Sequence, residues 1–356
     1  MRSPENSPRK DSGHRSESES EVTKIEISKL AGALGASALL LTVAGCGASN
    51  TGGEPVGGGA TEEAAESPWA NCTPGAESAD ITSTAPDADS EITIGTFNGW
   101  DESVAVAHLA KAVLEEDGYT VNIEAFDAGP GYVALDAGDI DLLVDSWLPL
   151  THEDYLEQYG DNLEAMGCWY DNAKLTIAVN DDSPAQSIAD LAEMGDEYGN
   201  RLVGIEPGAG LTRITKEEAI PTYGLEGYEF IESSTPAMLA ELKSATDSGE
   251  NIAVTLWRPH WAYGSFPIRD LEDPEGAMGD AELIYNFGTS GFGEAHPKAA
   301  QLMKNLVLDD ERLSDLESVM FAEDQYNGED PDGAVAEWLA DNPDFVEEWQ
   351  TGQLAG

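Results

Sequence analysis

The chain has 356 residues, enough for one large domain or two ordinary ones with an ample core. It carries 17 Lys and Arg residues against 69 Asp and Glu residues, for a net charge of -52. This balance excludes nucleic acid as a partner, because contacts to phosphates need a basic surface. We interpret the excess of acid as a surface suited to high salt, and an ordinary acidic secreted protein is the alternative.

Residues 1–45 are predicted to be a lipoprotein signal peptide. An apolar run from Leu30 follows basic residues and is too short and too rich in small side chains for a spanning helix. It ends in Val43-Ala44-Gly45-Cys46, which resembles a bacterial lipobox. We therefore expect cleavage before Cys46 and a lipid on its thiol, which would anchor the protein outside the cell membrane. A buried apolar helix ending at Cys46 is the alternative.

Residues 46–90 are predicted to be a flexible tether, because Gly, Ser, Thr, Ala and Glu dominate them and bury little apolar surface. With Cys46 set aside, Cys72 and Cys168 are the two cysteines left. In an oxidising exterior such a pair favours a disulfide, which would attach the segment around Cys72 to the folded body. Two free buried thiols are the alternative.

From residue 91 onward, strand patterns alternate with helix patterns. Strands are expected at 92–97, 120–126, 140–147, 174–179, 202–205, 228–231, 252–257 and 281–287, and helices at 103–116, 132–137, 152–159, from 187, at 212–219, at 236–245 and from 297. The alternation predicts an α/β fold with a parallel, helix-covered sheet. We expect two lobes, about 91–172 with 282–356 and about 173–281, joined at a hinge.

Aromatic residues gather where these strands end. They are Trp100, Trp147, Trp169 or Tyr170, Trp257 and Trp261. A single tryptophan is usually a core residue, but several at strand ends favour a binding site. Electron-rich ring faces around a cavity suit a cation that cannot donate hydrogen bonds, such as a quaternary ammonium. Sugar sites also use aromatic platforms, but the neighbouring loops contain few Asn or Gln residues for sugar hydroxyls.

Four motifs resemble, in order and spacing, those of substrate-binding proteins of glycine betaine, choline and related quaternary amine ABC importers. They are Phe97-Asn98-Gly99-Trp100-Asp101-Glu102, Asp145-Ser146-Trp147-Leu148-Pro149-Leu150-Thr151-His152, Gly204-Ile205-Glu206-Pro207-Gly208-Ala209-Gly210 and Thr255-Leu256-Trp257-Arg258-Pro259-His260-Trp261. The resemblance covers about 91–350. It implies a two-lobed periplasmic binding protein of type II, the Venus-flytrap fold, that delivers its ligand to a membrane permease with a cytoplasmic ATPase.

By the same resemblance, the cage consists of Trp100, Trp147 and Trp257, with Tyr170 as a further aromatic and Trp169 as its competitor. Glu102 falls where choline-type relatives place an acid, and it equally suits the first turn of a helix. His260 and Arg258, or backbone N–H groups near Gly208, are the donors available to a ligand carboxylate. Trp261 is expected to pack behind the loop.

The sequence contains no P-loop, no Gly-x-Ser-x-Gly elbow and no His pair at metal-ligand spacing, so we expect neither an enzyme nor a metal or cofactor site. The predicted function is an extracytoplasmic, lipid-anchored receptor for a quaternary ammonium solute, with glycine betaine favoured. Choline, carnitine and trimethylamine oxide are alternative ligands, and a surface sugar-binding or sensory protein is a more remote alternative.

The high-salt interpretation predicts that the protein becomes more stable as salt rises, because counterions screen the mutual repulsion of its carboxylates. Thermal melts at low and at molar sodium chloride measure this effect. A melting temperature that does not rise with salt contradicts the interpretation.

Overall fold

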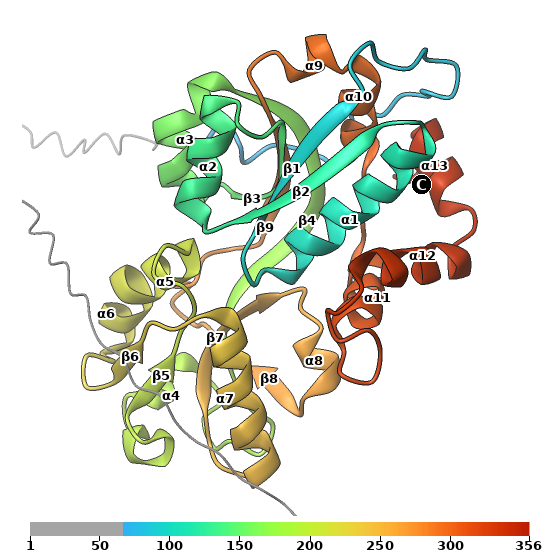
Figure 1. Ribbon diagram of the computed structural model, residues 1–356. Coiled ribbons are helices and arrows are strands. Elements are labelled where there is room, and N and C mark those ends of the chain that lie inside the picture. The colour runs from blue at the N-terminus through green and yellow to red at the C-terminus, as the bar shows by residue number, and fades with distance from the viewer. Residues whose placement is uncertain (1–66, 356) are drawn as a thin grey trace, which may run out of the picture. The chain divides into compact units, whose positions relative to one another are not determined.

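The computed structural model describes residues 67–355, and the expectations for the signal peptide and Cys46 lie outside this range. Two sheets, joined through one long strand, make up the body (Figure 1). The strands are β1 Glu91–Phe97, β2 Thr120–Phe126, β3 Leu142–Leu148, β4 Leu163–Asn180, β5 Arg201–Val203, β6 Glu229–Ile231, β7 Ala253–Arg258, β8 Ile268–Asp270 and β9 Glu282–Thr289.

Helices cover both sheets and fill most of the C-terminal region. They are α1 Asp101–Glu116, α2 Ala128–Ala137, α3 Glu153–Tyr159, α4 Ile188–Leu191, α5 Gly210–Ile214, α6 Ile220–Tyr223, α7 Thr235–Ser248, α8 Ala262–Ser265, α9 Phe292–Ala295, α10 Pro297–Asn305, α11 Asp310–Phe321, α12 Pro331–Asp341 and α13 Phe345–Thr351. Short 3-10 turns at Gly160–Asn162 and Gly195–Tyr198 and a π turn at Thr215–Ala219 complete the set. Within residues 67–355 no helix has the length and apolarity needed to cross a bilayer.

Strand β4 belongs to both sheets. It pairs with β9 from Leu163 to Ala173 and with β7 from Lys174 to Val179, so its partner changes between Ala173 and Lys174. In Figure 1, β4 runs from the upper sheet into the lower one. The expected lobe boundary near residue 172 falls beside this change, and the exact division into lobes stays a prediction.

The strand order is β2-β1-β3-β9-β4-β7-β5-β6, with β8 beside β4. The expected parallel pairing holds between β1 and β2, β1 and β3, β5 and β6, and β5 and β7. It is wrong for the centre, where β9 is antiparallel to both β3 and β4, and where β4 is antiparallel to β7 and β8. The reason is that β4 carries the chain into the second sheet and β9 carries it back, so the two run in opposite directions.

The predicted disulfide is confirmed, since Cys72 and Cys168 are bonded. Residues 67–90 contain no helix or strand, yet they contact the body beyond this bond. The Trp69 ring packs edge-on against Phe287 at 5.3 Å, and the Tyr285 hydroxyl donates to the Trp69 carbonyl at 2.7 Å. The C-terminal part of the predicted tether, residues 67–90, is therefore packed against the folded body.

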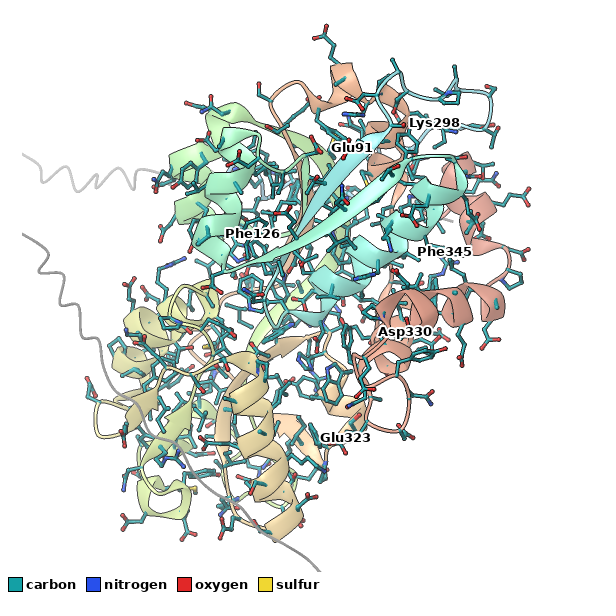
Figure 2. All side chains as sticks on the ribbon, viewed as in Figure 1. Glu91, Phe126, Lys298, Glu323, Asp330 and Phe345 are labelled. Carbon is teal, nitrogen blue, oxygen red and sulfur yellow. A yellow bond between two sulfur atoms is a disulfide. The ribbon has the colours of Figure 1, made fainter. Side chains whose placement is uncertain are left out.

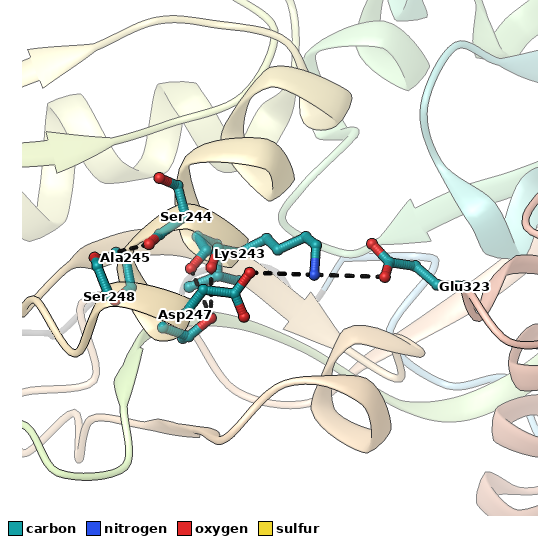
Figure 3. A network of polar contacts seen from close by, with 8 residues as sticks. Lys243, Ser244, Ala245, Asp247, Ser248 and Glu323 are labelled. Atoms are coloured by element: carbon teal, nitrogen blue, oxygen red, sulfur yellow. Dashed lines mark hydrogen bonds and ion pairs between the residues drawn. The ribbon is translucent and has the colours of Figure 1, made fainter.

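Local signals explain the ends of α7, which flanks the second sheet. Ser234 caps its N-terminus by accepting from the Ala237 N–H at 3.4 Å, and Gly249 ends it with a φ of 70°. Lys243 on this helix pairs at 3.4 Å with Asp247 and at 3.4 Å with Glu323, which follows α11 (Figure 3). The helix is thereby tied to the C-terminal region. Around the whole body, side chains tipped with oxygen project outward, in keeping with the net charge (Figure 2).

Candidate ligand-binding site

A cavity lies between the two sheets, where the ends of strands β3 and β7 meet the N-terminal ends of helices α1 and α5. The space among its lining side chains amounts to about 280 Å³, counting the part that is open to solvent. Its lining is mostly apolar and consists of Trp100, Glu102, Trp147, Thr151, His152, Leu175, Ile205, Ala209, Gly210, Leu211 and Trp257. Three of the tryptophans singled out from the sequence are thus brought together.

Hydrogen bonds to buried carboxyls orient two of the three indoles. Trp147 ends β3 and donates its Nε1–H to Asp145 at 2.8 Å, while Trp257 near the end of β7 donates to Glu102 at 3.1 Å. Trp100 caps α1, and its buried Nε1 has no partner. All three side chains are nearly buried, so their rings are held before any ligand binds.

The turn after β3 brings His152 into the cavity. Pro149 in this turn follows a cis peptide bond, and Glu282 of β9 accepts the N–H groups of Leu150 and Thr151 at 2.7 and 2.9 Å. The His152 ring then stacks on Trp100, with ring centroids 5.4 Å apart and planes 8° from parallel. Cavity wall and turn are therefore one packed unit.

His152 presents a hydrogen-bond donor to the cavity. Burial, with a smaller effect from the charge of Arg213, lowers the pKa of His152 to about 3, so the ring is neutral at physiological pH. Its Nδ1 accepts the Trp147 N–H at 2.9 Å, which leaves the ring proton on Nε2. That nitrogen is buried without a partner. We did not single out His152 from the sequence, although its place five residues after Trp147 in a quoted motif was a usable signal.

The start of α5 forms another part of the wall, where the expected glycine-rich loop lies. Ala209 precedes the helix, and the first N–H groups of a helix have no partner inside it. A Cβ on Gly210 would come within 2.0 Å of the Thr151 carbonyl oxygen, so only glycine fits here. This approach brings α5 of the second sheet against the turn that follows β3 of the first.

Tyr170 and His260, which were predicted to bind ligand, do not line this cavity. Both border a separate groove beside α11, where the Tyr170 hydroxyl donates to Asp310 at 2.7 Å. Strand β4 begins at Leu163, eleven residues earlier than the pattern predicted, so Tyr170 lies within a strand and not in a loop that faces the cavity. Its competitor Trp169 is fully buried and donates to the Val144 carbonyl at 2.8 Å.

His260 supports the cage from outside. Its ring meets Trp257 edge-on at 4.7 Å, and its Nδ1 accepts the Ala262 N–H at 3.1 Å. Burial lowers the pKa of His260 to about 3, so it is neutral. Trp261 donates its indole N–H to Asp101 and is absent from the lining, as the packing role expected for it requires. Arg258 is engaged with Asp270.

Buried carboxyls surround the cage. Burial raises the pKa of Asp145 to about 7, and it raises that of Glu102 well above its ordinary value, with further increases from Asp145, Glu317 and Asp101. Burial also raises the pKa of Glu317 well above its ordinary value. Within residues 67–355 no group of three or more His, Cys, Asp or Glu side chains is arranged to hold a metal ion.

Comparison with known proteins assigns the class. The family described as the substrate binding domain of ABC-type glycine betaine transport systems matches residues 90–341, and the chain belongs to this family. Its members are transport proteins and not enzymes. The chain is 33% identical over 162 residues to the glycine betaine/carnitine transport binding protein GbuC of Listeria monocytogenes, a match that covers 45% of this chain and 52% of that protein.

Solved structures agree with the two-lobed fold. Lactococcal OpuAC, closed on glycine betaine, superposes with a TM-score of 0.67 at 27% identity, covering 73% of this chain and 99% of that one. The glycine/betaine/L-proline-binding protein ProX of Borrelia burgdorferi gives 0.67 at 29%, covering 75% and 100%. An ABC-transporter choline binding protein in complex with choline gives 0.65 at 25%, covering 76% and 98%.

The buried carboxyls predict that the ligand-free protein loses stability as pH rises above 6.5. A carboxyl with a higher pKa in the folded state releases its proton later than in the unfolded state, so the unfolding free energy falls between the two pKa values. For Asp145 this window runs from its ordinary value up to about 7, and it extends higher for the cluster as a whole. His152 and His260, with lowered pKa values, reduce stability only below about 6.5.

Urea unfolding of the ligand-free protein at constant salt should show that the free energy of unfolding falls by about 1 to 3 kcal/mol between pH 6.5 and 8. Asp145→Asn should reduce this fall, because the Asn side chain can still accept the indole N–H of Trp147 but does not ionise. Asp139→Asn, at an exposed turn before the same strand, is the matched control and should behave as the parent protein. A parent protein equally stable at both pH values contradicts the argument.

Proposed function

We propose that this protein is the extracytoplasmic receptor of an ABC importer and binds a quaternary ammonium compatible solute, with glycine betaine favoured. The observation that carries the proposal is the cavity itself, in which three tryptophans and a neutral histidine donor line one small space. The family assignment of residues 90–341 and the betaine-bound lactococcal relative support the same ligand class.

The cage accounts for the cationic end of such a ligand. A trimethylammonium group has no N–H to donate, so it gains from ring faces and from burial instead of from hydrogen bonds. Each desolvated ring contributes about 0.5 to 2 kcal/mol, and three rings supply a large share of the roughly 8 kcal/mol that micromolar affinity requires. Trp100, Trp147 and Trp257 are the rings available.

The donors in the same cavity account for a carboxylate. The His152 Nε2–H has no protein partner, and Gly210 and Leu211 at the start of α5 contribute first-turn N–H groups to the wall. In glycine betaine one carbon separates the carboxylate from the ammonium. The ligand can therefore contact the tryptophan rings with its ammonium and the N–H donors with its carboxylate. Lys and Arg are absent from the lining, so the neutral donors would bind the carboxylate without repelling the ammonium.

Choline is the principal alternative ligand, because Glu102 also lines the cavity and could accept its hydroxyl. Carnitine and trimethylamine oxide also offer a quaternary nitrogen with an anionic oxygen. A sugar is disfavoured, since among the described residues the lining offers Glu102, Thr151, His152 and the free indole N–H of Trp100, too few polar groups to satisfy several hydroxyls. The sensory alternative shares the cavity and differs in having no permease partner.

Closure of two lobes would seal the ligand from water and present the receptor to a permease, which works with a cytoplasmic ATPase. Contacts that support such closure flank the cavity. The Trp257 bond to Glu102 joins β7 to α1, and the Tyr155 hydroxyl donates to the Gly208 carbonyl at 2.9 Å. Lobes of about 91–172 with 282–356 and about 173–281, hinged where β4 changes partner, remain our assignment.

Calorimetry with glycine betaine, choline, carnitine and trimethylamine oxide tests the proposal. We expect His152→Ala to weaken glycine betaine about tenfold or more through loss of a donor to its carboxylate, and to change choline less than about threefold. Trp147→Ala should weaken both by about tenfold, because both carry the ammonium. His108→Ala, which removes a pair with Asp332 where α1 meets α12 and lies outside the cavity lining, is the matched control and should alter neither.

Several outcomes contradict the proposal in distinct ways. Binding of none of the four ligands below millimolar concentration rejects the cage. Equal losses for glycine betaine and choline in His152→Ala reject the carboxylate assignment alone. Tenfold tighter binding of choline by the parent protein replaces glycine betaine as the ligand.

We also propose that Cys46 is lipidated and anchors the receptor to the cell membrane. The lipobox-like Val43-Ala44-Gly45-Cys46 after an apolar run supports this, and the acidic composition supports a saline habitat in which compatible solutes are needed. In cells, the parent protein should partition into the detergent phase of Triton X-114 extracts, while Cys46→Ala should move to the aqueous phase. Partition of both into the aqueous phase contradicts the anchor.

A further inference from the structure

Four acidic side chains lie around the inner side of the cage and have no counter-charge. Asp101 and Glu102 come from α1, Asp145 from β3, and Glu317 from α11, which packs against α1. We call them the carboxyl cluster. Asp145 and Glu317 have no exposed surface, and Glu102 is 2% exposed. Asp101 keeps 16% of its side chain exposed and is the member nearest to solvent.

We propose that the carboxyl cluster holds protons while the cage is empty and releases one when a quaternary ammonium enters, so that pH sets both affinity and the preference between cationic and zwitterionic ligands. This inference rests on the proposed function, and it adds Glu317 as a specificity residue that does not line the cavity.

The cluster is coupled to the cage through its indoles. Trp147 donates to Asp145 at 2.8 Å, Trp257 donates to Glu102 at 3.1 Å, and Trp261 donates to Asp101. Three of the four carboxyls therefore accept a hydrogen bond directly from an indole, two from cage tryptophans and one from Trp261, which packs beside the cage. Glu102 also reaches the cavity surface itself. A positive charge among the rings is consequently close to the whole cluster.

Glu317 has unsatisfied oxygens. Both of its carboxyl oxygens are buried without a hydrogen-bond partner, as is Oδ2 of Asp145. An ionised carboxylate in such a place loses its hydration and gains nothing in return, so the protonated form is favoured. The raised pKa values of Asp101 and Asp145, both about 7, agree with protons held near neutral pH.

Other charged groups near the cluster do not neutralise it. Among the described residues, the one ion pair that involves a cluster member joins Asp101 to His260 at 3.9 Å, and that histidine is neutral because burial lowers its pKa to about 3. His152 is neutral for the same reason. Among residues 67–355, the other titratable groups that face a cluster member are Tyr170 on β4, near Glu317, and Tyr132 on α2, near Asp145, and burial raises the pKa of both phenols, so neither is charged.

A ligand cation supplies the missing charge. When the ammonium enters, one carboxyl in the cluster loses its proton to solvent, so one positive charge replaces another and the buried charge stays constant. Mass action then makes binding tighter as pH rises, by up to about tenfold per pH unit where a full proton is released. Glycine betaine brings its own carboxylate into the cavity, so it should release fewer protons than choline.

The test is calorimetry of choline and glycine betaine from pH 5.5 to 8.5, in pairs of buffers with different ionisation enthalpies, which counts the protons exchanged. We expect choline to release about half a proton or more near pH 6.5, and its affinity relative to glycine betaine to rise several-fold between pH 6 and 8. Glu317→Gln should at least halve the release, since Gln has no proton to give up when the ammonium enters. Glu311→Gln, exposed on the same helix, is the matched control and should release as the parent does.

The outcomes separate this inference from the proposed function. Binding of choline or glycine betaine without proton exchange in the parent protein overturns the inference and leaves the proposed function standing. Unchanged release in Glu317→Gln overturns the role of Glu317, and if that variant fails to fold, Asp145→Asn replaces it with the same expectation. Failure of every quaternary amine to bind at any pH overturns both.

Discussion

The hydrogen bond from the Trp257 indole to Glu102 joins the two sheets at the cavity, and much of the site depends on it. Trp257 arrives from β7 of the second sheet and Glu102 from the first turn of α1 above the first sheet. The donor comes from the second sheet and its buried acceptor from beside the first. The cavity wall is therefore complete only when the two sheets are in contact at this point. The same hydrogen bond orients the Trp257 ring and holds the Glu102 carboxyl at the cavity wall. It therefore affects both the shape of the cavity and its electrostatic potential.

Two features bring the two sides together. Strand β4 runs unbroken from one sheet into the other, and β9 returns beside it, so the connection consists of paired backbone. The Cys72–Cys168 bond attaches residues 67–90 to the first half of β4. The hinge that we propose for ligand capture lies where β4 changes its partner.

Acidic residues serve two opposite purposes in this chain. Most of the Asp and Glu residues in 67–355 are exposed or half-buried, so water and counterions stabilise their charge. Of the buried acids in this range, Glu102, Asp145 and Glu317 have no Lys or Arg partner, and burial raises their pKa values. Composition alone cannot separate the two groups, because the same residue types occur in both. Their position decides whether an acid contributes to solubility or to the potential felt by a ligand.

The sequence by itself determined the α/β class, most element positions, the disulfide partners and three tryptophans that line the cavity. These follow from local periodicity, from a cysteine count and from aromatics placed where strands end, signals that need no knowledge of distant contacts. Tertiary structure alone decided the antiparallel centre, the exclusion of Tyr170 and His260 from the lining, the place of a neutral His152 in the lining and the packing of the helix of Glu317 against α1. Each of these depends on which faces pack together across long separations. The face to which Tyr170 points depends on β4 starting at Leu163, and the state of Glu317 depends on burial by residues more than 150 positions away.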